Sequence, residues 1–375
     1  MMNRNVTILC SGFGLGFYIP GILVARGLEK FGISSDIYVF ESVLDPEKQR
    51  RIDDSKAAYH HHFAAAQLAT RLPKDIRDSI DARAAQQLIE QWDLEEREHF
   101  IALSGNWVYI LDLYREHRIS KGHRAPDVDL LYVDSDYSPS WRSMKKFVSD
   151  FKSRYREVWL YRAEIGEIER CIPIGEEETV PYDNRRLSYV VHGGGWGIGT
   201  YRNEAEELER LGIALDIVAY LEEEAGQEMN GNRWFMNDPK WKAWETSPGS
   251  TPGFPPFAEL VPDETPVYKA PLEHHGLYGI IRQASGIISK PGAGTLMDSL
   301  ASATPLIMLD PFGSHEAHNA TLWQKLGLGI SMADWKAEGY SREALRPLHE
   351  RLLAARANAK DYIEEYAHAF AAFNS

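Results

Sequence analysis

The sequence feature that most constrains the fold is a pattern of strand, glycine-rich turn and helix that occurs twice. Residues 5–10 (NVTILC) are a short β-branched run, followed by the glycine-rich stretch 11–16 and a helical segment that ends near Gly32. The same order starts again at residues 187–199 (LSYVVHGGGWGIG), which lead into another helical segment. Strands that alternate with helices predict parallel sheets. Two consecutive units predict an α/β chain of two doubly wound, Rossmann-like domains, with ligands at the carboxyl ends of the strands.

Further apolar runs complete both units. The sequence predicts mostly helix across residues 54–100, a terminal helix over residues 343–373 and a surface loop in the Pro/Gly-rich stretch 245–266. Additional strands are predicted at residues 34–42, 99–105, 127–136, 158–165, 267–271, 284–289 and 304–309.

These elements divide the chain at the polar connector 172–186, which carries Pro173 and Pro181. We expect an N-terminal domain over residues 1–180 and a C-terminal domain over residues 181–355. Residues 356–375 are expected to form a terminal helix that packs back on the N-terminal domain.

Charge and composition exclude several classes of protein. The formal net charge of −14 argues against broad nucleic-acid binding, which relies on clustered Lys and Arg. Cys10 and Cys171 are the two cysteines, and they make neither a metal-binding spacing nor a disulfide framework. No apolar run reaches the ~18 residues of a membrane span, and the first residues are not typical of a signal peptide. A cytoplasmic location is therefore predicted, with peripheral membrane contact left open.

Three glycine-rich turns are candidates for binding an anion. They contain Gly12, Gly14 and Gly16 after the first strand, the run 193–199 with Gly194 and Gly195, and Gly292 with Gly294. Glycine permits a positive φ and close approach of a ligand to the backbone. The helix that follows such a turn offers unpaired N–H groups to a phosphate. The first turn lacks the spacing of the dinucleotide fingerprint, and ordinary turn chemistry explains it equally well.

More than glycine is present at the third turn. Thr295 and Asp298 follow it, and His315, Glu316 and Asn319 enter a helix after the next strand. A carboxylate can accept hydrogen bonds from two vicinal hydroxyl groups, as a ribose would require of Asp298. A phosphate cradle, an acid for ribose and a polar cluster for a sugar together predict a nucleotide-sugar site.

Residues 290–329 (KPGAGTLMDSLASATPLIMLDPFGSHEAHNATLWQKLGLG) resemble the donor site of GT-B glycosyltransferases. The nearest likenesses are the bacterial lipid II N-acetylglucosaminyltransferases and the plant monogalactosyldiacylglycerol synthases. The resemblance implies two Rossmann-like domains that face a central cleft, with the acceptor on residues 1–180 and a UDP-sugar on residues 181–355. It implies no metal and no further cofactor. The implied donor-site residues are Gly14, Gly16, Gly194, Gly195, Gly292, Ala293, Gly294, Thr295, Asp298, His315, Glu316 and Asn319.

In that resemblance Thr295 and the turn amides meet the diphosphate, Asp298 meets the ribose, and His315 or Glu316 meets the sugar hydroxyls. Two positions depart from the family pattern, because Phe17 stands where the lipid II enzymes have a histidine and Asp298 replaces the commoner glutamate. A base is therefore sought elsewhere.

The candidates for the catalytic base are Asp136 and, next, Asp134, at the end of a predicted strand. Turn or helix-cap chemistry is the alternative role of this Asp-Ser-Asp. A further alternative is the Asp-x-Asp metal motif of the GT-A glycosyltransferases. The run His60, His61 and His62 is expected on a solvated helix face.

These features predict an inverting, metal-independent glycosyltransferase that moves a hexose from a UDP-sugar to a small-molecule acceptor, natural products included. The acceptor would be apolar or aromatic, because aromatic residues crowd the first turn and its surroundings, among them Phe13, Phe17 and Tyr18. The alternatives are a nucleotide-sugar 2-epimerase or hydrolase of the same fold, and a non-catalytic relative.

Overall fold

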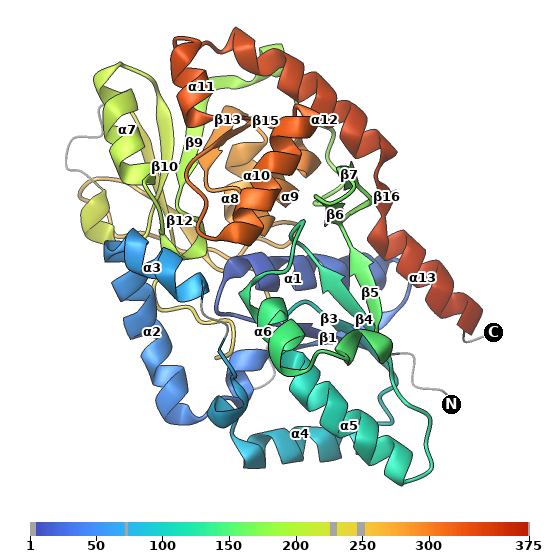
Figure 1. Ribbon diagram of the computed structural model, residues 1–375. Helices are drawn as coiled ribbons and strands as arrows, with labels where there is room; N and C mark the ends of the chain where they lie inside the picture. Colours follow the sequence, from blue (N-terminus) through green and yellow to red (C-terminus); the bar gives the residue numbers. More distant parts are fainter. Residues whose placement is uncertain (1–4, 72–73, 226–230, 246–251, 374–375) are drawn as a thin grey trace.

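Two separate sheets form the framework of the computed structural model, which describes residues 5–71, 74–225, 231–245 and 252–373 (Figure 1). The first sheet has the strand order β2-β1-β3-β4-β5, and every pair of neighbours is parallel. We call the part of the chain around this sheet the N-terminal lobe. Its strands are β1 (Asn5–Cys10), β2 (Ser34–Val39), β3 (His99–Ala102), β4 (Asp127–Tyr132) and β5 (Arg156–Trp159).

The second sheet has the order β12-β11-β10-β9-β13-β14-β15 and forms the centre of the C-terminal lobe. Its neighbours are parallel except at one edge, where β12 runs antiparallel to β11. The predicted pair of doubly wound α/β units is thus confirmed. The strands are β9 (Arg186–His192), β10 (Leu215–Ala219), β11 (Arg233–Asn237), β12 (Phe257–Leu260), β13 (Ala284–Ser289), β14 (Leu306–Met308) and β15 (Gly329–Ser331).

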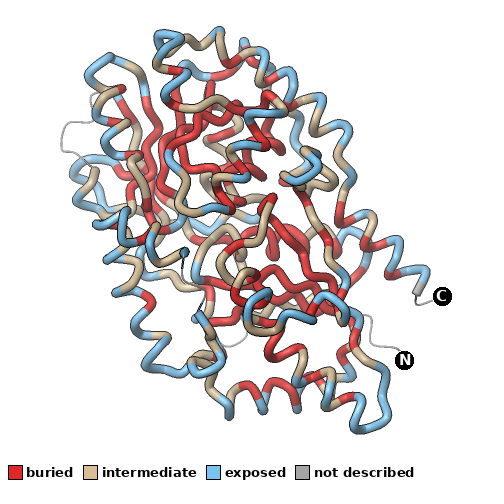
Figure 2. Tube along the Cα trace, in the orientation of Figure 1, coloured by how far each residue is buried: buried red, intermediate tan, exposed pale blue. Residues whose placement is uncertain are grey.

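Helices cover the sheets, and Figure 2 shows that the buried residues concentrate in the strands and on the inner sides of these helices. In the N-terminal lobe they are α1 (Leu15–Lys30), α2 (Pro46–His61), α3 (Phe63–Thr70), α4 (Ala82–Leu94), α5 (Val108–Ser120) and α6 (Pro139–Phe147). The C-terminal lobe has α7 (Tyr201–Arg210), α8 (Gly276–Ile281), α9 (Ala293–Ser302), α10 (Ser314–Leu326), α11 (Met332–Ala337) and α12 (Arg346–Asn358). In the described part of the chain, no helix combines the length and the apolar character that crossing a bilayer requires.

One hydrophobic core runs through both lobes. Helix α1 contacts β1 on one side and α9 of the other lobe. Val24 of α1 and Leu296 of α9 are fully buried members of the same cluster. A Cβ placed on Gly21 of α1 would overlap the Sγ of Cys10 in β1, so the helix can approach the strand this closely only with glycine there. The first glycine-rich turn is thereby held against the C-terminal lobe.

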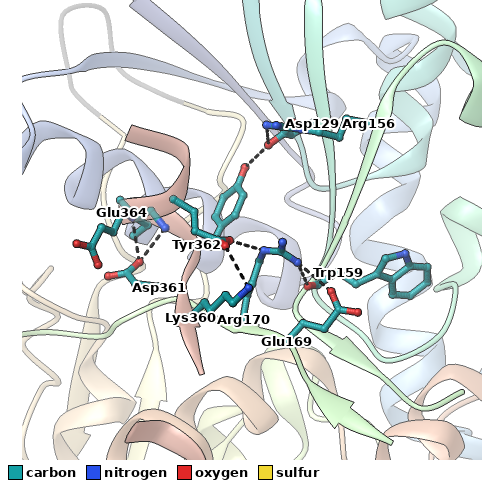
Figure 3. Close-up of polar contacts among 11 residues, drawn as sticks. Asp129, Arg156, Trp159, Glu169, Arg170, Lys360, Asp361, Tyr362 and Glu364 are labelled. Carbon is teal, nitrogen blue, oxygen red and sulfur yellow. Dashed lines mark hydrogen bonds and ion pairs between the residues drawn. The ribbon is translucent and has the colours of Figure 1, made fainter. Parts of the chain in front are cut away.

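After α12 the chain returns to the N-terminal lobe. The short strand β16 (Lys360–Asp361) pairs in parallel with β8 (Arg170–Cys171), and α13 (Tyr362–Phe373) follows directly. Figure 3 shows the polar contacts at this return. The Tyr362 hydroxyl donates to Asp129 Oδ2 at 3.1 Å, and Arg156 Nη2 donates to the same oxygen at 2.8 Å.

Some predicted elements differ from the structure. Residues 267–271 were predicted as a strand, but they make only an isolated bridge from Lys269 to Phe257. The predicted loop 245–266 contains β12 and the buried Phe254, while its residues 246–251 lie outside the described residues. The predicted terminal helix is divided by β16. Strand β11 was not predicted.

Candidate active site

A cavity of about 520 Å³ lies where the carboxyl ends of strands from both sheets meet. All three glycine-rich turns line it. The turn after β1 contributes Gly14 and Gly16, the turn after β9 contributes Gly194 and Gly195, and the turn after β13 contributes Gly292 and Gly294. In open α/β sheets ligands bind at this end of the strands. The cavity is therefore the candidate active site.

The turns approach one another so closely that side chains would not fit everywhere. A Cβ on Gly195 would lie 2.8 Å from Cγ of Leu15, which is too close to fit, whereas one on Gly16 would lie at a normal contact distance of 3.7 Å from the amide nitrogen of Gly294. Gly194 has a φ of 74°, in the region that favours glycine. The amide groups of this turn and of the first turn of α9 are consequently close to the cavity without shielding side chains.

The residues predicted for the donor lie along one wall of the cavity. Ala293, Thr295 and Asp298 belong to α9, and His315 and Glu316 belong to the first turn of α10. Asp298 Oδ1 lies 2.8 Å from Nε2 of His275, which also lines the cavity. Both residues are buried. The imidazole therefore fixes the orientation of the Asp298 carboxylate.

Glu316 belongs to a buried ion pair. Its Oε1 lies 3.6 Å from Nζ of Lys290, and its Oε2 accepts a hydrogen bond from the Phe312 amide at 2.6 Å. The Lys290 side chain is 10% exposed and lines the cavity. A buried ammonium group thus stands beside the turn after β13. Sequence reasoning did not single out Lys290, although it directly precedes the Pro291-Gly292 turn.

Asn319 does not line the cavity, and it connects the two lobes instead. Its Oδ1 accepts from the amide and the hydroxyl of Ser135 at 2.8 and 2.7 Å. Its Nδ2 donates to Asp134 Oδ1 at 2.8 Å and to the Pro291 carbonyl at 2.9 Å. The side chain is fully buried, so all four hydrogen bonds are shielded from water.

The two candidate bases have different surroundings. Asp134 is buried and lines the cavity. Burial raises the pKa of Asp134, while His315 and the Asn319 amide oppose this rise. Asp136 is not among the residues that line the cavity. Its Oδ2 accepts from Arg142 at 3.0 Å and lies 3.3 Å from Nδ1 of His318.

The residues described here contain no group of three or more His, Cys, Asp and Glu side chains placed to hold a metal ion. Asp134 and Asp136, the candidate Asp-x-Asp pair, have different partners, because Asp134 accepts from Asn319 and Asp136 accepts from Arg142.

Glu41 at the end of β2 is another cavity residue that sequence reasoning missed. Its Oε1 accepts from the Ser11 hydroxyl at 2.7 Å and from the Phe13 amide at 2.9 Å, and its Oε2 accepts from the Gly12 amide at 2.6 Å. Burial raises the pKa of this carboxyl, and these donors lower it. Glu41 holds the first glycine-rich turn in place. Glu41 directly follows β2, which pairs with β1, and an acidic residue at the carboxyl end of a strand was the signal in the sequence that could have indicated it.

The expectation of a solvated histidine run is confirmed for His61 and His62, which are exposed, and is wrong for His60. The side chain is buried, with Nδ1 2.7 Å from the Gly197 carbonyl oxygen and Nε2 2.7 Å from Glu224 Oε1. Because His60 belongs to α2 and its partners to the C-terminal lobe, this contact also connects the lobes.

Aromatic and aliphatic side chains line the N-terminal side of the cavity. Phe13 of the first turn packs edge-on against Trp196, with ring centroids 4.1 Å apart. The apolar lining also includes Phe17, Phe40 and Tyr59 of the N-terminal lobe, and Phe312, like Trp196, comes from the C-terminal lobe. This end of the cavity therefore suits an apolar or aromatic molecule.

No protein-family model matches the sequence, and no curated protein sequence matches it significantly. Solved structures do match along the whole chain. The glycosyltransferase SnogD from Streptomyces nogalater has a TM-score of 0.52, 12% identity and 99% coverage of both chains. The glycosyltransferase VinC in complex with DTDP has a TM-score of 0.56 and 10% identity, with 98% of both chains covered.

A UDP-glucosyltransferase from Polygonum tinctorium, capable of glucosylating indoxyl, has a TM-score of 0.52 and 10% identity over 98% of both chains. At these identities the likeness concerns the fold. The chain has the GT-B glycosyltransferase fold that its residues 290–329 predicted.

Proposed function

We propose that the protein is an inverting, metal-independent glycosyltransferase that moves a hexose from a nucleoside-diphosphate sugar, UDP-linked in the first instance, to an apolar small-molecule acceptor. The observation that carries the proposal is the shared cavity. It combines glycine-rich turns and polar residues of the C-terminal lobe with aromatic side chains of the N-terminal lobe, among them Phe13, Phe17 and Phe40. Two substrates of different chemistry would meet there.

The donor would bind along the wall formed by α9 and α10. The amides of Ala293 and Gly294 and the hydroxyl of Thr295 would donate to the diphosphate, which the dipole of α9 would also stabilise. Asp298, oriented by His275, would accept from the ribose hydroxyls. The Lys290 ammonium, which lines the cavity, would offset part of the diphosphate charge in place of a metal ion.

The transfer itself would proceed in one displacement. The acceptor hydroxyl oxygen forms a bond to the anomeric carbon while the bond from that carbon to the diphosphate oxygen breaks. The bonding electron pair leaves with the nucleoside diphosphate, and Asp134 takes the acceptor proton. We assign this role to Asp134 because it lines the cavity and Asp136 does not. Attack from the opposite face inverts the configuration of the anomeric carbon.

A thermal-shift screen of nucleoside diphosphates and nucleotide sugars, with EDTA present, tests the donor half of the proposal. A ligand at 100 times its dissociation constant stabilises a protein by about 2.7 kcal/mol, which raises the melting temperature measurably. We expect UDP or a related diphosphate to stabilise the protein in EDTA. Stabilisation that appears only with Mg²⁺ or Mn²⁺ would contradict metal independence.

An incubation with the donor but without an acceptor distinguishes a transferase from an epimerase or a hydrolase. Incubation with the bound nucleotide sugar should leave it intact until an aromatic alcohol is added, as followed by NMR. A new sugar formed without an acceptor would identify an epimerase, and free hexose would identify a hydrolase. Donor binding without any turnover across an acceptor panel would favour a non-catalytic relative.

A further inference from the structure

His192 ends β9 directly before the turn 193–199, and it is a buried side chain that the proposed chemistry has not yet used. It lines the cavity, but only 4% of the residue is exposed. The Gly194 amide donates to His192 Nδ1 at 3.1 Å, and the Ser289 hydroxyl lies 3.4 Å from the same nitrogen. Nδ1 is therefore a hydrogen-bond acceptor, and the ring proton of the neutral imidazole belongs to Nε2.

The Nε2–H group has no hydrogen-bond partner in the part of the chain that the structure describes. The atom is buried and meets no hydrogen-bond acceptor among the described residues. A buried donor without a partner is unfavourable, and a ligand in the cavity could complete this one because His192 lines that cavity. The missing partner must be an acceptor, because Nε2 carries the proton.

The surroundings of His192 favour an anion as that partner. Burial, with smaller contributions from Lys290 and His275, lowers the pKa of His192 to about 3, so the imidazole stays neutral at pH 7. Lys290 lines the same part of the cavity, and a Cβ on Gly194 would lie 3.5 Å from its Nζ. A neutral donor, an ammonium group and turn amides converge here, and such a set binds phosphate oxygens.

We propose, building on the proposed function, that His192 binds a diphosphate oxygen of the donor through Nε2–H. The side chain joins the turn after β9 to the turn after β13 around one anion, since Ser289 pairs with His192 across the two strands. The hydrogen bond strengthens as negative charge develops on the departing diphosphate. Lys290 provides the charge, and His192 provides a directed donor that stays uncharged.

Two substitutions distinguish the acceptor role of His192 Nδ1 from the donor role of Nε2–H. His192→Asn places an amide oxygen near the position of Nδ1 and removes the distal donor, so the Gly194 amide keeps an acceptor. His192→Gln carries an amide N–H at about the reach of Nε2. We expect H192N to weaken UDP binding at least tenfold, the effect of a hydrogen bond to a charged group, and H192Q to stay within about threefold of wild type. Uridine, which has no phosphate, should bind both variants as it binds wild type.

Calorimetric titration with UDP and uridine, with melting temperatures to show that each variant folds, gives every outcome a meaning. Unchanged UDP binding in H192N overturns the role of His192 alone. An equal loss of UDP and uridine binding in H192N also overturns it, because the effect is then structural. If wild-type protein binds neither UDP nor another nucleoside diphosphate, the proposed function fails first and this inference fails with it.

Discussion

At the scale of single residues, Asp134 and Asp136 differ because burial acts on one and solvent on the other. Asp134 is enclosed between the lobes and holds Asn319, whereas Asp136 is partly exposed and pairs with Arg142. A general base works best when its pKa is moved toward the working pH, and burial moves that of Asp134 upward. Two carboxylates separated by one serine are thus suited to different roles.

We expect Asp134→Asn to lower kcat at least 100-fold and to change the dissociation constant of UDP less than about threefold. Asparagine keeps an oxygen for Asn319 and removes the basic group. Asp136→Asn is the matched control and should retain most of the activity. Steady-state kinetics and UDP titration of both variants test this, and a larger loss in D136N than in D134N would contradict the assignment.

The pH profile of the wild-type enzyme provides an independent check on Asp134. The base must be deprotonated, so kcat/KM should fall as the pH decreases through the pKa of this group. Because burial raises that pKa, the midpoint of the acidic limb should lie above about 4, the ordinary value for aspartate. A limb at or below that value in a pH–rate measurement would argue for an exposed carboxylate as the base.

The sequence predicted some site residues better than others, for a physical reason. Gly292, Thr295 and Asp298 follow one another on a turn and the first turns of a helix, so local spacing alone brings them to the cavity. Their contacts with a donor stay predictions. The sequence placed His192 either on the cleft or in a packing role, and it did not single out Lys290. The meeting of these two residues depends on the register of β9 with β13, which connects residues far apart in the chain.

At the scale of elements, the strand–turn–helix order was predictable, and two features of the second half of the chain were not. Strand β12 lies in a Pro/Gly-rich stretch and pairs antiparallel at the sheet edge, where strand signals are weak. The break between α12 and α13 has no proline or glycine. It arises because Lys360 and Asp361 pair with β8, and Asp361 Oδ1 then accepts from the Ile363 amide at 2.7 Å.

The packing of α1 on β1 gives a prediction about stability. Gly21→Ala should lower the free energy of unfolding by about 1–2 kcal/mol, because overlap with the Cys10 sulfur outweighs the better helix propensity of alanine. Gly14→Ala is the control, since a Cβ there meets no atom within 4 Å and the residue precedes the same helix. Its effect should stay within about 0.5 kcal/mol in urea denaturation, and equal effects of the two changes would refute the packing argument.

At the scale of the whole molecule, two buried polar contacts hold the lobes together beside the shared hydrophobic core. One is the set of hydrogen bonds around Asn319, and the other joins His60 of α2 to Glu224. Burial alone would raise the pKa of Glu224, but hydrogen bonds from His60 and the Tyr220 amide lower it to about 2. The Glu224 carboxylate is therefore ionised in the contact that joins the two lobes.

A pKa lowered in the folded state stabilises the protein above the unfolded value of about 4.3, and this contribution is lost as the pH falls toward 2. The stability difference between wild type and Glu224→Gln should consequently shrink by about 1–2 kcal/mol between pH 6 and pH 3. The neighbouring Glu223→Gln, at an exposed residue, should leave the pH dependence unchanged. Urea denaturation at both pH values measures the difference, and identical pH dependence in all three proteins would rule out this role for Glu224.

The pairing of β8 with β16 has a consequence for motion. The chain passes between the lobes once after β8 and returns once through β16, and these two passages are hydrogen-bonded to each other. Because these two short strands lie side by side, they form one narrow attachment, about which a lobe can rotate more easily than it can slide past its neighbour. The lobes should therefore open and close by a hinge rotation about the β8–β16 pair, and this rotation would admit substrates and release products.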